Sequence, residues 1–198
     1  HATPPSTPAG PAPLQFLRGC FRVTLLERIA QTLRALEIDA VVIGATAMAA
    51  HGVSRSTLDI DLFTVDPRAL HHRSWDRLKS DAVDIEIRHG DASDPLRGVV
   101  RFEGSGERPV DLIVGHGGWQ AQVFVDAKSL RFGSVDLPVV NPVALVLLKL
   151  YADGPQDRSD IIQLLAADAS GSLTARVREA LNGLPDQLRT SWSKIDPE

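Results

Sequence analysis

Apolar residues recur along the chain with spacings that change between those of helices and those of strands. Residues 21–37 carry leucine and isoleucine every three or four positions, which predicts an amphipathic helix with one buried face. The β-branched run at 40–43 stops at Gly44, which predicts a buried strand. The alanine-rich stretch at 45–51 predicts a short helix that ends at Gly52.

The middle of the chain shows the alternation of apolar and polar residues that is typical of strands. Strands are expected at 57–65, 83–88, 99–102 and 110–114, a helix at 68–80, and short strands around 122–126 and 135–140. From Pro142 onward the pattern predicts helices at 142–152, 158–168, 172–183 and 186–194. This order predicts an α/β (α+β) fold, with a mixed β-sheet flanked by helices and a C-terminal helical part.

The length of 198 residues fits one domain, or one domain with a small helical extension. We expect a flexible proline-rich leader at 1–13, a core at 14–140, and a C-terminal helical part packed on the core at 141–198. An apolar content of 43% allows a sizeable core. No apolar run approaches the roughly 20 residues that a bilayer span needs, so we expect a soluble protein that has no membrane among its partners.

Charge and cysteine content narrow the cellular setting. A single cysteine, Cys20, excludes an internal disulfide and suits a reducing cytoplasm, which is the expected location. The formal net charge of −4 argues against broad, nonspecific nucleic-acid binding, because such binding neutralises many phosphates. A local basic patch that handles one nucleotide or one RNA end remains compatible with this charge.

Two aspartates occupy alternate positions of the strand expected at 57–65. Side chains alternate between the faces of a strand, so Asp59 and Asp61 should project to the same side. The opposite side, which an apolar core can cover, should receive Leu58, Ile60 and Leu62. Two carboxylates on one face repel each other unless a cation lies between them. Mg²⁺ is the natural candidate, since it takes hard oxygen ligands and leaves positions for water and phosphate oxygens.

A third aspartate interrupts another apolar strand. Asp111 lies within the strand expected at 110–114, where a buried carboxylate without a partner would be costly. Beside the strand of Asp59 and Asp61, it would complete a cluster of three carboxylates that can hold two metal ions.

An Asp-x-Asp pair alone is weak evidence, because most such pairs are solvated strand or turn residues. A haloacid-dehalogenase phosphatase would need a threonine where this chain has Phe63. A glycosyltransferase would use the pair to hold the metal of a nucleotide sugar, usually in a longer chain. Residues upstream of the pair distinguish these alternatives.

The upstream residues are Ile43-Gly44-Ala45, Gly52, Arg55 and Thr57, followed by Asp59-Ile60-Asp61. This pattern resembles the signature of the nucleotidyltransferase superfamily (polymerase-β-like fold), in which a Gly-Gly or Gly-Ser turn precedes an Asp-h-Asp strand. Downstream, RPVDLIV around Asp111 resembles the strand of the third carboxylate. The segment 141–165 resembles a Lys…Arg-x-Asp helix pair, with Lys149, Arg158 and Asp160 at the matching positions of its sequence NPVALVLLKLYADGPQDRSDIIQLL. Within the superfamily, the chain looks most similar to the AbiEii/AbiGii toxin type and its uncharacterised relatives.

The resemblance implies an enzyme that moves a nucleoside monophosphate (NMP) from a nucleoside triphosphate (NTP) to a hydroxyl acceptor. Asp59 and Asp61 would hold Mg²⁺, with two ions expected, and neutralise the phosphates and the leaving pyrophosphate. Asp111 would help to bind the second ion and deprotonate the attacking hydroxyl. Catalysis of this kind rests mainly on positioning and charge stabilisation.

The nucleotide side of the expected site comprises five residues. Gly44 would let the backbone approach the triphosphate, whose oxygens the amides of the next helix could bind. Ala45 stands where a serine would bind phosphate, so Thr46 or the backbone would have to substitute. Lys149 would reach the phosphates, or be an ordinary lysine with a buried apolar stem. Arg55 could bind phosphate or clamp a carboxylate.

Other residues would support the site. Thr57 is expected to hold the loop, while Arg158 and Asp160 form either a structural ion pair or part of the site.

The resemblance makes an RNA end, tRNA especially, a candidate acceptor and an antitoxin a candidate partner. A protein side chain or a small molecule such as an aminoglycoside remains open as acceptor.

Two other functions remain open. A catalytically degenerate domain of the same fold would bind nucleotide or a partner protein without turnover. Ala45 favours this alternative, and the intact set of Asp59, Asp61 and Asp111 disfavours it. A metal-dependent phosphohydrolase would release free phosphate, whereas a transferase would release pyrophosphate.

Overall fold

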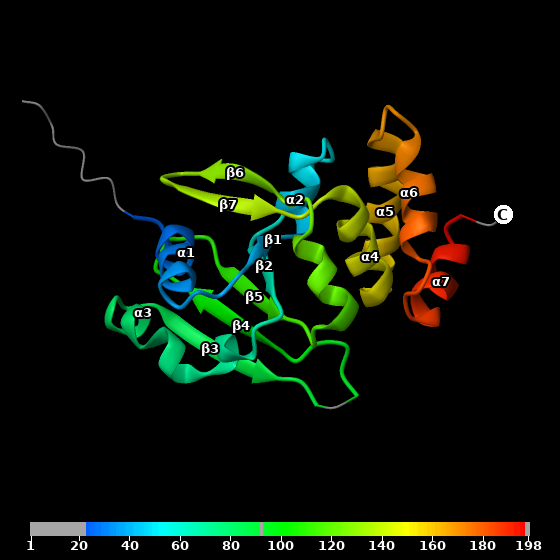
Figure 1. Ribbon diagram of the computed structural model, residues 1–198. Helices are drawn as coiled ribbons and strands as arrows, with labels where there is room; N and C mark the ends of the chain where they lie inside the picture. Colours follow the sequence, from blue (N-terminus) through cyan, green and yellow to red (C-terminus); the bar gives the residue numbers. More distant parts are fainter. Residues whose placement is uncertain (1–22, 92, 197–198) are drawn as a thin grey trace, which may run out of the picture.

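The structure, a computed structural model, describes residues 23–91 and 93–196, so the leader expected at 1–13 and Cys20 lie outside the described residues. A seven-stranded mixed sheet forms its centre, in the order β3-β4-β5-β2-β1-β7-β6 (Figure 1). The strands are β1 (Val41–Val42), β2 (Ile60–Thr64), β3 (Asp84–His89), β4 (Gly98–Glu103), β5 (Val110–Val114), β6 (Lys128–Phe132) and β7 (Val135–Val139). This sheet with flanking helices confirms the predicted fold class.

Strand β2 lies at the middle of the sheet and pairs with β1 antiparallel and with β5 parallel. Alternate residues of β5 enter the core, and so do Ile60 and Leu62 of β2, with Leu62 and Leu112 each 0% exposed. The residues between them, Asp61 and Asp111, lie directly opposite each other in the parallel register and are half-buried. The alternation of a strand therefore fixes both the core face and the carboxylate face.

Helices and turns from the first half of the chain cover the apolar face of the sheet. These elements are α1 (Leu25–Ala35), η1 (Pro67–Leu70), η2 (His72–Trp75) and α3 (Asp76–Ser80). Helix α1 begins with a capping box in which Thr24 and Glu27 bond to each other's backbone amide. Trp75 of η2 packs edge-on against Phe102 of β4, with ring centroids 4.8 Å apart, which anchors this layer to the sheet.

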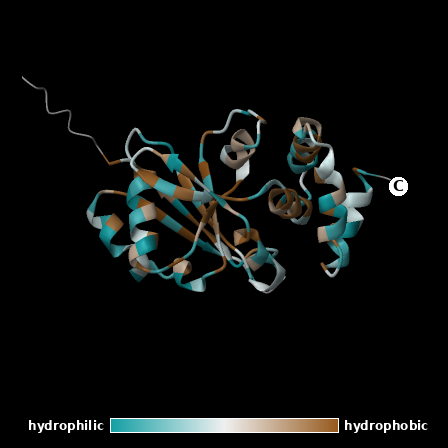
Figure 2. Ribbon diagram, turned by 45° about the horizontal axis from the view of Figure 1, so that its top comes forward, coloured by the Kyte–Doolittle hydropathy of each residue, from teal (hydrophilic) through white to brown (hydrophobic). Residues whose placement is uncertain are grey.

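The C-terminal helices gather at the side of the sheet near α2 (Gly44–Ala50) and η3 (Gly118–Phe124) (Figure 1). They are α4 (Pro142–Ala152), α5 (Pro155–Ala167), α6 (Ser172–Ala180) and α7 (Asp186–Ser193). Helix α4 contacts α2, η3 and the other three helices, and apolar residues gather in the strands and between these helices (Figure 2). One cluster of buried apolar residues includes side chains from the sheet and from α4–α7. The proposed boundary near residue 140 stays a prediction.

The structure corrects three predicted elements. The strand expected around 122–126 is absent, because the chain there forms the turn of η3, which follows Gly117 and Gly118 at positive φ. Strand β6 escaped prediction, because four of its five residues are exposed and no apolar alternation marks it. The helix expected at 68–80 is broken at His71, whose backbone is extended.

The remaining helices and strands agree with prediction to within a few residues. Within the described ranges, no helix combines the length and the apolar character needed to cross a membrane.

Candidate functional site

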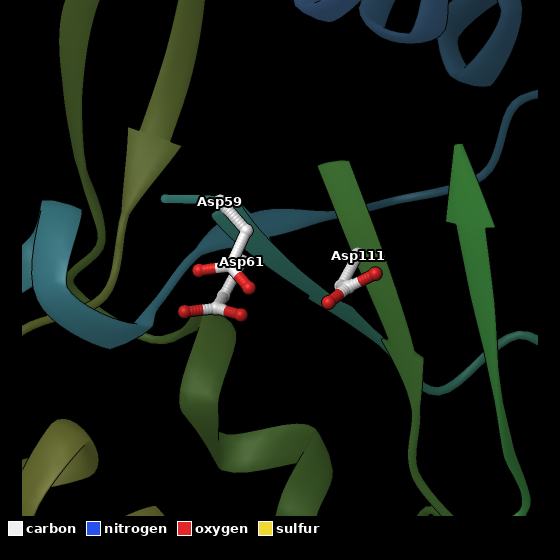
Figure 3. A group of neighbouring side chains, drawn as sticks. All are labelled: Asp59, Asp61 and Asp111. Carbon is white, nitrogen blue, oxygen red and sulfur yellow. The ribbon is translucent and has the colours of Figure 1, made fainter. Parts of the chain in front are cut away.

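Three carboxylates meet where β2 begins and β5 runs beside it (Figure 3). Asp59 directly precedes β2, Asp61 lies in β2, and Asp111 lies in β5. One carboxylate oxygen from each residue lies within 4.8 Å of the other two. The parallel register places Asp61 directly opposite Asp111, so neighbouring backbones hold the two side chains at the same level. The structure therefore brings together the three aspartates that the sequence singled out.

The strand alternation that predicted this face fails at Leu58. Ile60 and Leu62 are buried as expected, but Leu58 is 87% exposed. The cause is that β2 begins only at Ile60, so residues 53–59 form a loop in which faces do not alternate. The prediction that Leu58 enters the core is wrong.

Side chains, and not strand geometry, hold Asp59 in place. The hydroxyl of Thr57 donates to the Asp59 carboxylate (Oγ1–Oδ1 2.6 Å). The guanidinium of Arg108 donates to the backbone oxygen of Asp59 over 2.9 Å. Thr57 thus supports the loop, as its position suggested, by orienting a candidate metal ligand.

Gly44 makes room for Asp61. Its φ of +61° lies in the left-handed region, and a Cβ at this position would lie 1.9 Å from Oδ2 of Asp61. The backbone amide of Ile43 also donates to the backbone oxygen of Asp61 (2.9 Å). Glycine is therefore required here by the carboxylate itself, in addition to any approach of a ligand. Of the next two residues, Ala45 is buried and Thr46 is partly exposed.

The electrostatics of the cluster are unfavourable without a cation. Burial, together with the charges of Asp59 and Asp111, raises the pKa of Asp61 to about 6 against the opposing charges of Lys149 and Arg55. Burial also raises the pKa of Asp111. Carboxylates that resist ionisation in this way gain stability when a cation neutralises them.

Arg101 is a site residue that the sequence analysis missed. It lies opposite Asp111 in the β4–β5 register, and its Nη1 lies 2.9 and 3.2 Å from the two carboxylate oxygens of Asp111. Arg101 also pairs with Glu103 (2.7 Å). The alternation of the strand predicted at 99–102 carried the signal, since it places Arg101 on the polar face.

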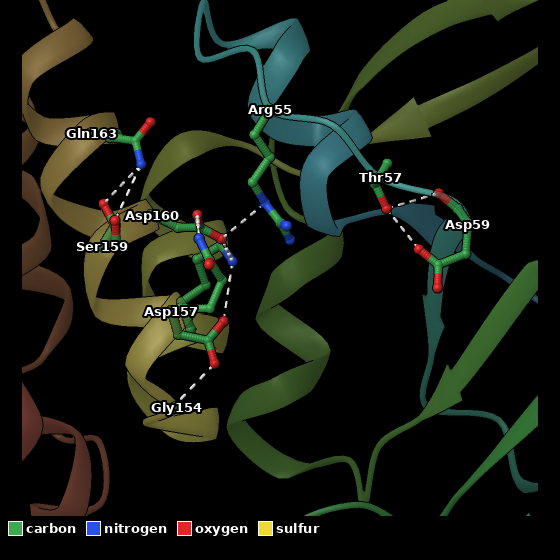
Figure 4. A network of polar contacts seen from close by, with 10 residues as sticks. Arg55, Thr57, Asp59, Gly154, Asp157, Ser159, Asp160 and Gln163 are labelled. Atoms are coloured by element: carbon green, nitrogen blue, oxygen red, sulfur yellow. Dashed lines mark hydrogen bonds and ion pairs between the residues drawn. The ribbon is translucent and has the colours of Figure 1, made fainter.

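A second polar cluster lies between α4, α5 and the loop at 53–59 (Figure 4). Nζ of Lys149 lies 2.6 Å from Oδ2 of Asp160 and 3.1 Å from Oδ1 of Asp157. Gln156 donates to the other carboxylate oxygen of Asp160 (2.8 Å). Nε of Arg55 lies 3.5 Å from Oδ2 of Asp160. We name Lys149, Asp157, Asp160, Gln156 and Arg55 the Asp160 cluster.

The structure does not pair Arg158 with Asp160. Arg158 contacts Asp153 instead (3.0 Å), because its side chain leaves α5 toward the end of α4 while Asp160 points inward. The expectation of an Arg158–Asp160 ion pair is therefore wrong, and Asp160 belongs with Lys149 and Arg55.

Residues 22–194 match a protein family described as nucleotidyl transferase of unknown function (DUF2204). The chain belongs to this family. Membership confirms the resemblance to nucleotidyltransferases, while the AbiEii/AbiGii toxin type stays a prediction. No curated protein matches this nucleotidyl transferase.

Two matches among solved structures cover most of this chain. The antibiotic-resistance factor ANT(2'')-Ia, in its solution structure, is 12% identical, covers 87% of this chain and 94% of its own, and superposes with a TM-score of 0.52. An antigenic nucleotidyltransferase-like protein from Paracoccidioides brasiliensis is 20% identical, with 83% and 88% coverage and a TM-score of 0.44. At these identities, the likeness to ANT(2'')-Ia supports a shared fold.

The donor set of this nucleotidyl transferase fits a hard divalent cation. The three clustered ligands are all carboxylates, and oxygen-only sets suit Mg²⁺ better than the softer transition metals. The raised pKa values of Asp61 and Asp111, which follow from burial and from the nearby carboxylates, agree with a cation at this position.

Proposed function

We propose that this nucleotidyl transferase is Mg²⁺-dependent and moves an NMP from an NTP to a hydroxyl acceptor. The observation that carries the proposal is the convergence of Asp59, Asp61 and Asp111, with ligand oxygens within 4.8 Å of one another. The β2–β5 register places Asp61 opposite Asp111, and Gly44 leaves room for the Asp61 carboxylate, so the backbone brings these like charges together. Such a cluster is poised to receive cations and phosphate.

The three carboxylates would share metal binding, and Asp111 would in addition act as the base. Asp59, Asp61 and Asp111 would hold two Mg²⁺ ions, which would supply charge neutralisation for the triphosphate and the pyrophosphate leaving group. Asp111 would accept the proton of the attacking hydroxyl as its oxygen bonds to the α-phosphorus and the bond to pyrophosphate breaks. The place of Asp111 opposite Asp61 in the β2–β5 register supports this role, because it puts the carboxylate within the candidate metal cluster. Arg101 would orient Asp111 through its contact with both oxygens.

The nucleotide would lie on the side of the triad that faces α2 and the Asp160 cluster. Arg55 and Lys149 bring positive charge to this side, since both oppose the rise in the pKa of Asp61. Gly44, Ala45 and Thr46 begin α2 next to Asp61. The backbone and the hydroxyl of Thr46 would contact the triphosphate in place of the serine that Ala45 replaces.

The acceptor is proposed from weaker observations. The toxin-like sequence resemblance supports an RNA end, tRNA especially, with an antitoxin as partner. The likeness in fold to an antibiotic-resistance factor supports a small hydroxylated molecule as the alternative acceptor. The cytoplasm contains the NTPs that such an enzyme would consume, which is the support for a cytoplasmic location.

Incubation with each of four α-labelled NTPs, Mg²⁺, and either total RNA or an aminoglycoside panel tests the function. Wild-type protein should transfer label and release pyrophosphate, and Asp59→Ala should do neither. Asp84→Ala is the matched control, because Asp84 is exposed on β3 of the same sheet and lies outside the triad. Release of free phosphate would indicate a phosphohydrolase instead.

One observation favours a second function. Ala45 is 2% exposed and offers no hydroxyl, which is compatible with a degenerate domain that binds nucleotide or a partner without turnover. This alternative predicts Mg²⁺-dependent NTP binding by calorimetry with no pyrophosphate release. Absence of both binding and transfer would contradict the enzyme and the nucleotide-binding domain alike.

A further inference from the structure

Asp160 is a fully buried carboxylate (0% exposed) to which the proposed reaction assigns no task. A buried charge is expensive unless partners compensate it. Asp160 has three such partners from three parts of the chain: Lys149 of α4, Gln156 of α5, and Arg55 of the loop at 53–59. This one side chain therefore joins the C-terminal helices to the loop that carries Thr57 and Asp59.

The two cations of the cluster are held differently. The Lys149 side chain is 8% exposed, and its ammonium contacts both Asp157 and Asp160. The Arg55 side chain is 33% exposed and approaches Asp160 only through Nε. Within residues 23–91 and 93–196, Asp160 is the only carboxylate that pairs with Arg55, with Nε as the nearest nitrogen at 3.5 Å. Lys149 is therefore held by two carboxylates, whereas Arg55 is held by Asp160 at a longer distance.

The guanidinium of Arg55 lies between α5 and Asp59 of the triad (Figure 4). Arg55 stands between the aspartates of α5 on one side and Thr57 and Asp59 on the other (Figure 4). A guanidinium is planar and can bond one partner through Nε while its Nη atoms present a fork to phosphate oxygens. The ion pair with Asp160, at 3.5 Å, holds the Nε side of the guanidinium near α5.

We propose that Asp160 is a positioning residue that aims Arg55 at the triphosphate, and that Lys149 serves Asp160 and does not contact the nucleotide. The inference rests on the proposed function and divides the two cations of the nucleotide side between a binding role and a supporting role. Lys149 neutralises Asp160 and fixes Oδ2, and Gln156 fixes Oδ1. Asp160 in turn orients Arg55, which binds phosphate through its Nη atoms.

Asp160→Asn tests the positioning role, because it keeps the size of the side chain and removes the charge that holds Arg55. We expect the Kd for Mg²⁺-NTP, measured by calorimetry, and the KM for NTP to rise roughly tenfold to a hundredfold, with a smaller change in kcat. Asp153→Asn is the matched control, because Asp153 forms two exposed ion pairs on the same helix pair outside the cluster. This control should leave Kd and KM unchanged.

A double-mutant cycle separates positioning from loss of stability. If Asp160 acts through Arg55, Arg55→Lys combined with Asp160→Asn should bind NTP no more weakly than Arg55→Lys alone. Multiplied losses would overturn the proposal. Gln156→Met removes one contact that orients Asp160 and no charge, so it provides a milder variant with the same expected direction if Asp160→Asn does not fold.

The outcomes distinguish this inference from the proposed function. Wild-type protein that neither binds NTP nor transfers label removes the proposed function and this inference with it. Wild-type protein that binds and transfers, together with a folded Asp160→Asn variant of unchanged Kd and KM, removes only the role of Asp160.

Discussion

Two groups of aspartates lie side by side in this nucleotidyl transferase and have opposite surroundings. In the triad, Asp59, Asp61 and Asp111 face one another, and the pKa of Asp61 rises to about 6. In the Asp160 cluster, each aspartate contacts a cation, with Lys149 within 3.1 Å of both Asp157 and Asp160. In the triad, Asp111 pairs with Arg101 (2.9 Å), while among the described residues Asp59 and Asp61 have no ion pair.

The difference separates a binding site from a structural brace. The fully buried Asp160 would be the costlier charge in isolation, yet its side-chain contacts with Lys149 and Gln156 satisfy both carboxylate oxygens. The half-buried triad is incompletely neutralised, because Arg101 pairs with Asp111 while the charges of Asp59 and Asp111 help to raise the pKa of Asp61. Clustered carboxylates that are incompletely neutralised favour a cation as ligand, and carboxylates matched with cations favour a supporting role.

The largest expected effect comes from removing a triad member. Asp61→Ala should lower NMP transfer by roughly 10³-fold or more, because it removes a ligand of the charge that stabilises the transition state. The same change should not lower the free energy of unfolding, since it relieves repulsion. Initial rates and urea denaturation check the two halves. A large loss of stability would mean that the triad is structural.

Removing Lys149 from the Asp160 cluster should lower the free energy of unfolding, in contrast to removing a carboxylate from the triad. Lys149→Met leaves Asp160 buried without its main partner and should lower the free energy of unfolding by about 3 kcal/mol. Urea denaturation measures the change. The double variant Lys149→Met with Asp160→Leu is the control and should recover much of the loss, because it removes the charge left alone. Equal loss in both variants would contradict this account.

A smaller effect is expected in the pH dependence of the free energy of unfolding, which should report the repulsion among the triad carboxylates. The pKa of Asp61 in the folded state, about 6, exceeds its ordinary value of 3.8, so between these values the native state binds more protons than the unfolded state. The contribution of this group to stability is present at low pH and is lost as pH rises through about 6. Without Mg²⁺, wild-type protein should therefore lose stability relative to Asp61→Asn across this window in urea titrations. Parallel curves would contradict the raised pKa.

The smallest effect is expected outside both groups. Asp153→Asn breaks exposed contacts with Arg158 and Lys194 and should change the free energy of unfolding by less than about 1 kcal/mol. Asparagine also tolerates the left-handed backbone of this position, where φ is 49°. Thermal denaturation and transfer assays should match wild type. A large effect would place this ion pair among the functional contacts and weaken the contrast between the two clusters.

The sequence predicted the triad because its geometry follows from local rules. Alternation along β2 and β5 puts Asp61 and Asp111 on the polar face of the sheet, although core residues flank both of them in the sequence. An aspartate within such an apolar strand is unusual, so the sequence alone marks both residues. The same rule misplaced Leu58, because alternation holds only inside a strand and β2 begins two residues later. The loop that orients Asp59 through Thr57 depends on contacts that no periodicity encodes.

The Asp160 cluster could not be predicted in the same way. Its members come from the loop at 53–59, α4 and α5, so their contacts depend on how the helices pack against the site. The family resemblance left Arg158 and Asp160 as either an ion pair or part of the site. Helical spacing could have excluded the ion pair, because residues two positions apart on a helix lie on different faces.

The parallel pairing of β2 and β5 also governs when the triad exists. Asp61 and Asp111 lie about 50 residues apart in the chain, so they meet only after a long loop has closed, a late and slow event in folding. A ligand that needs both carboxylates cannot help to form that pairing, but it must leave before the strands can separate. Such a ligand should act on the lifetime of the native state, slowing unfolding while leaving the folding rate almost unchanged.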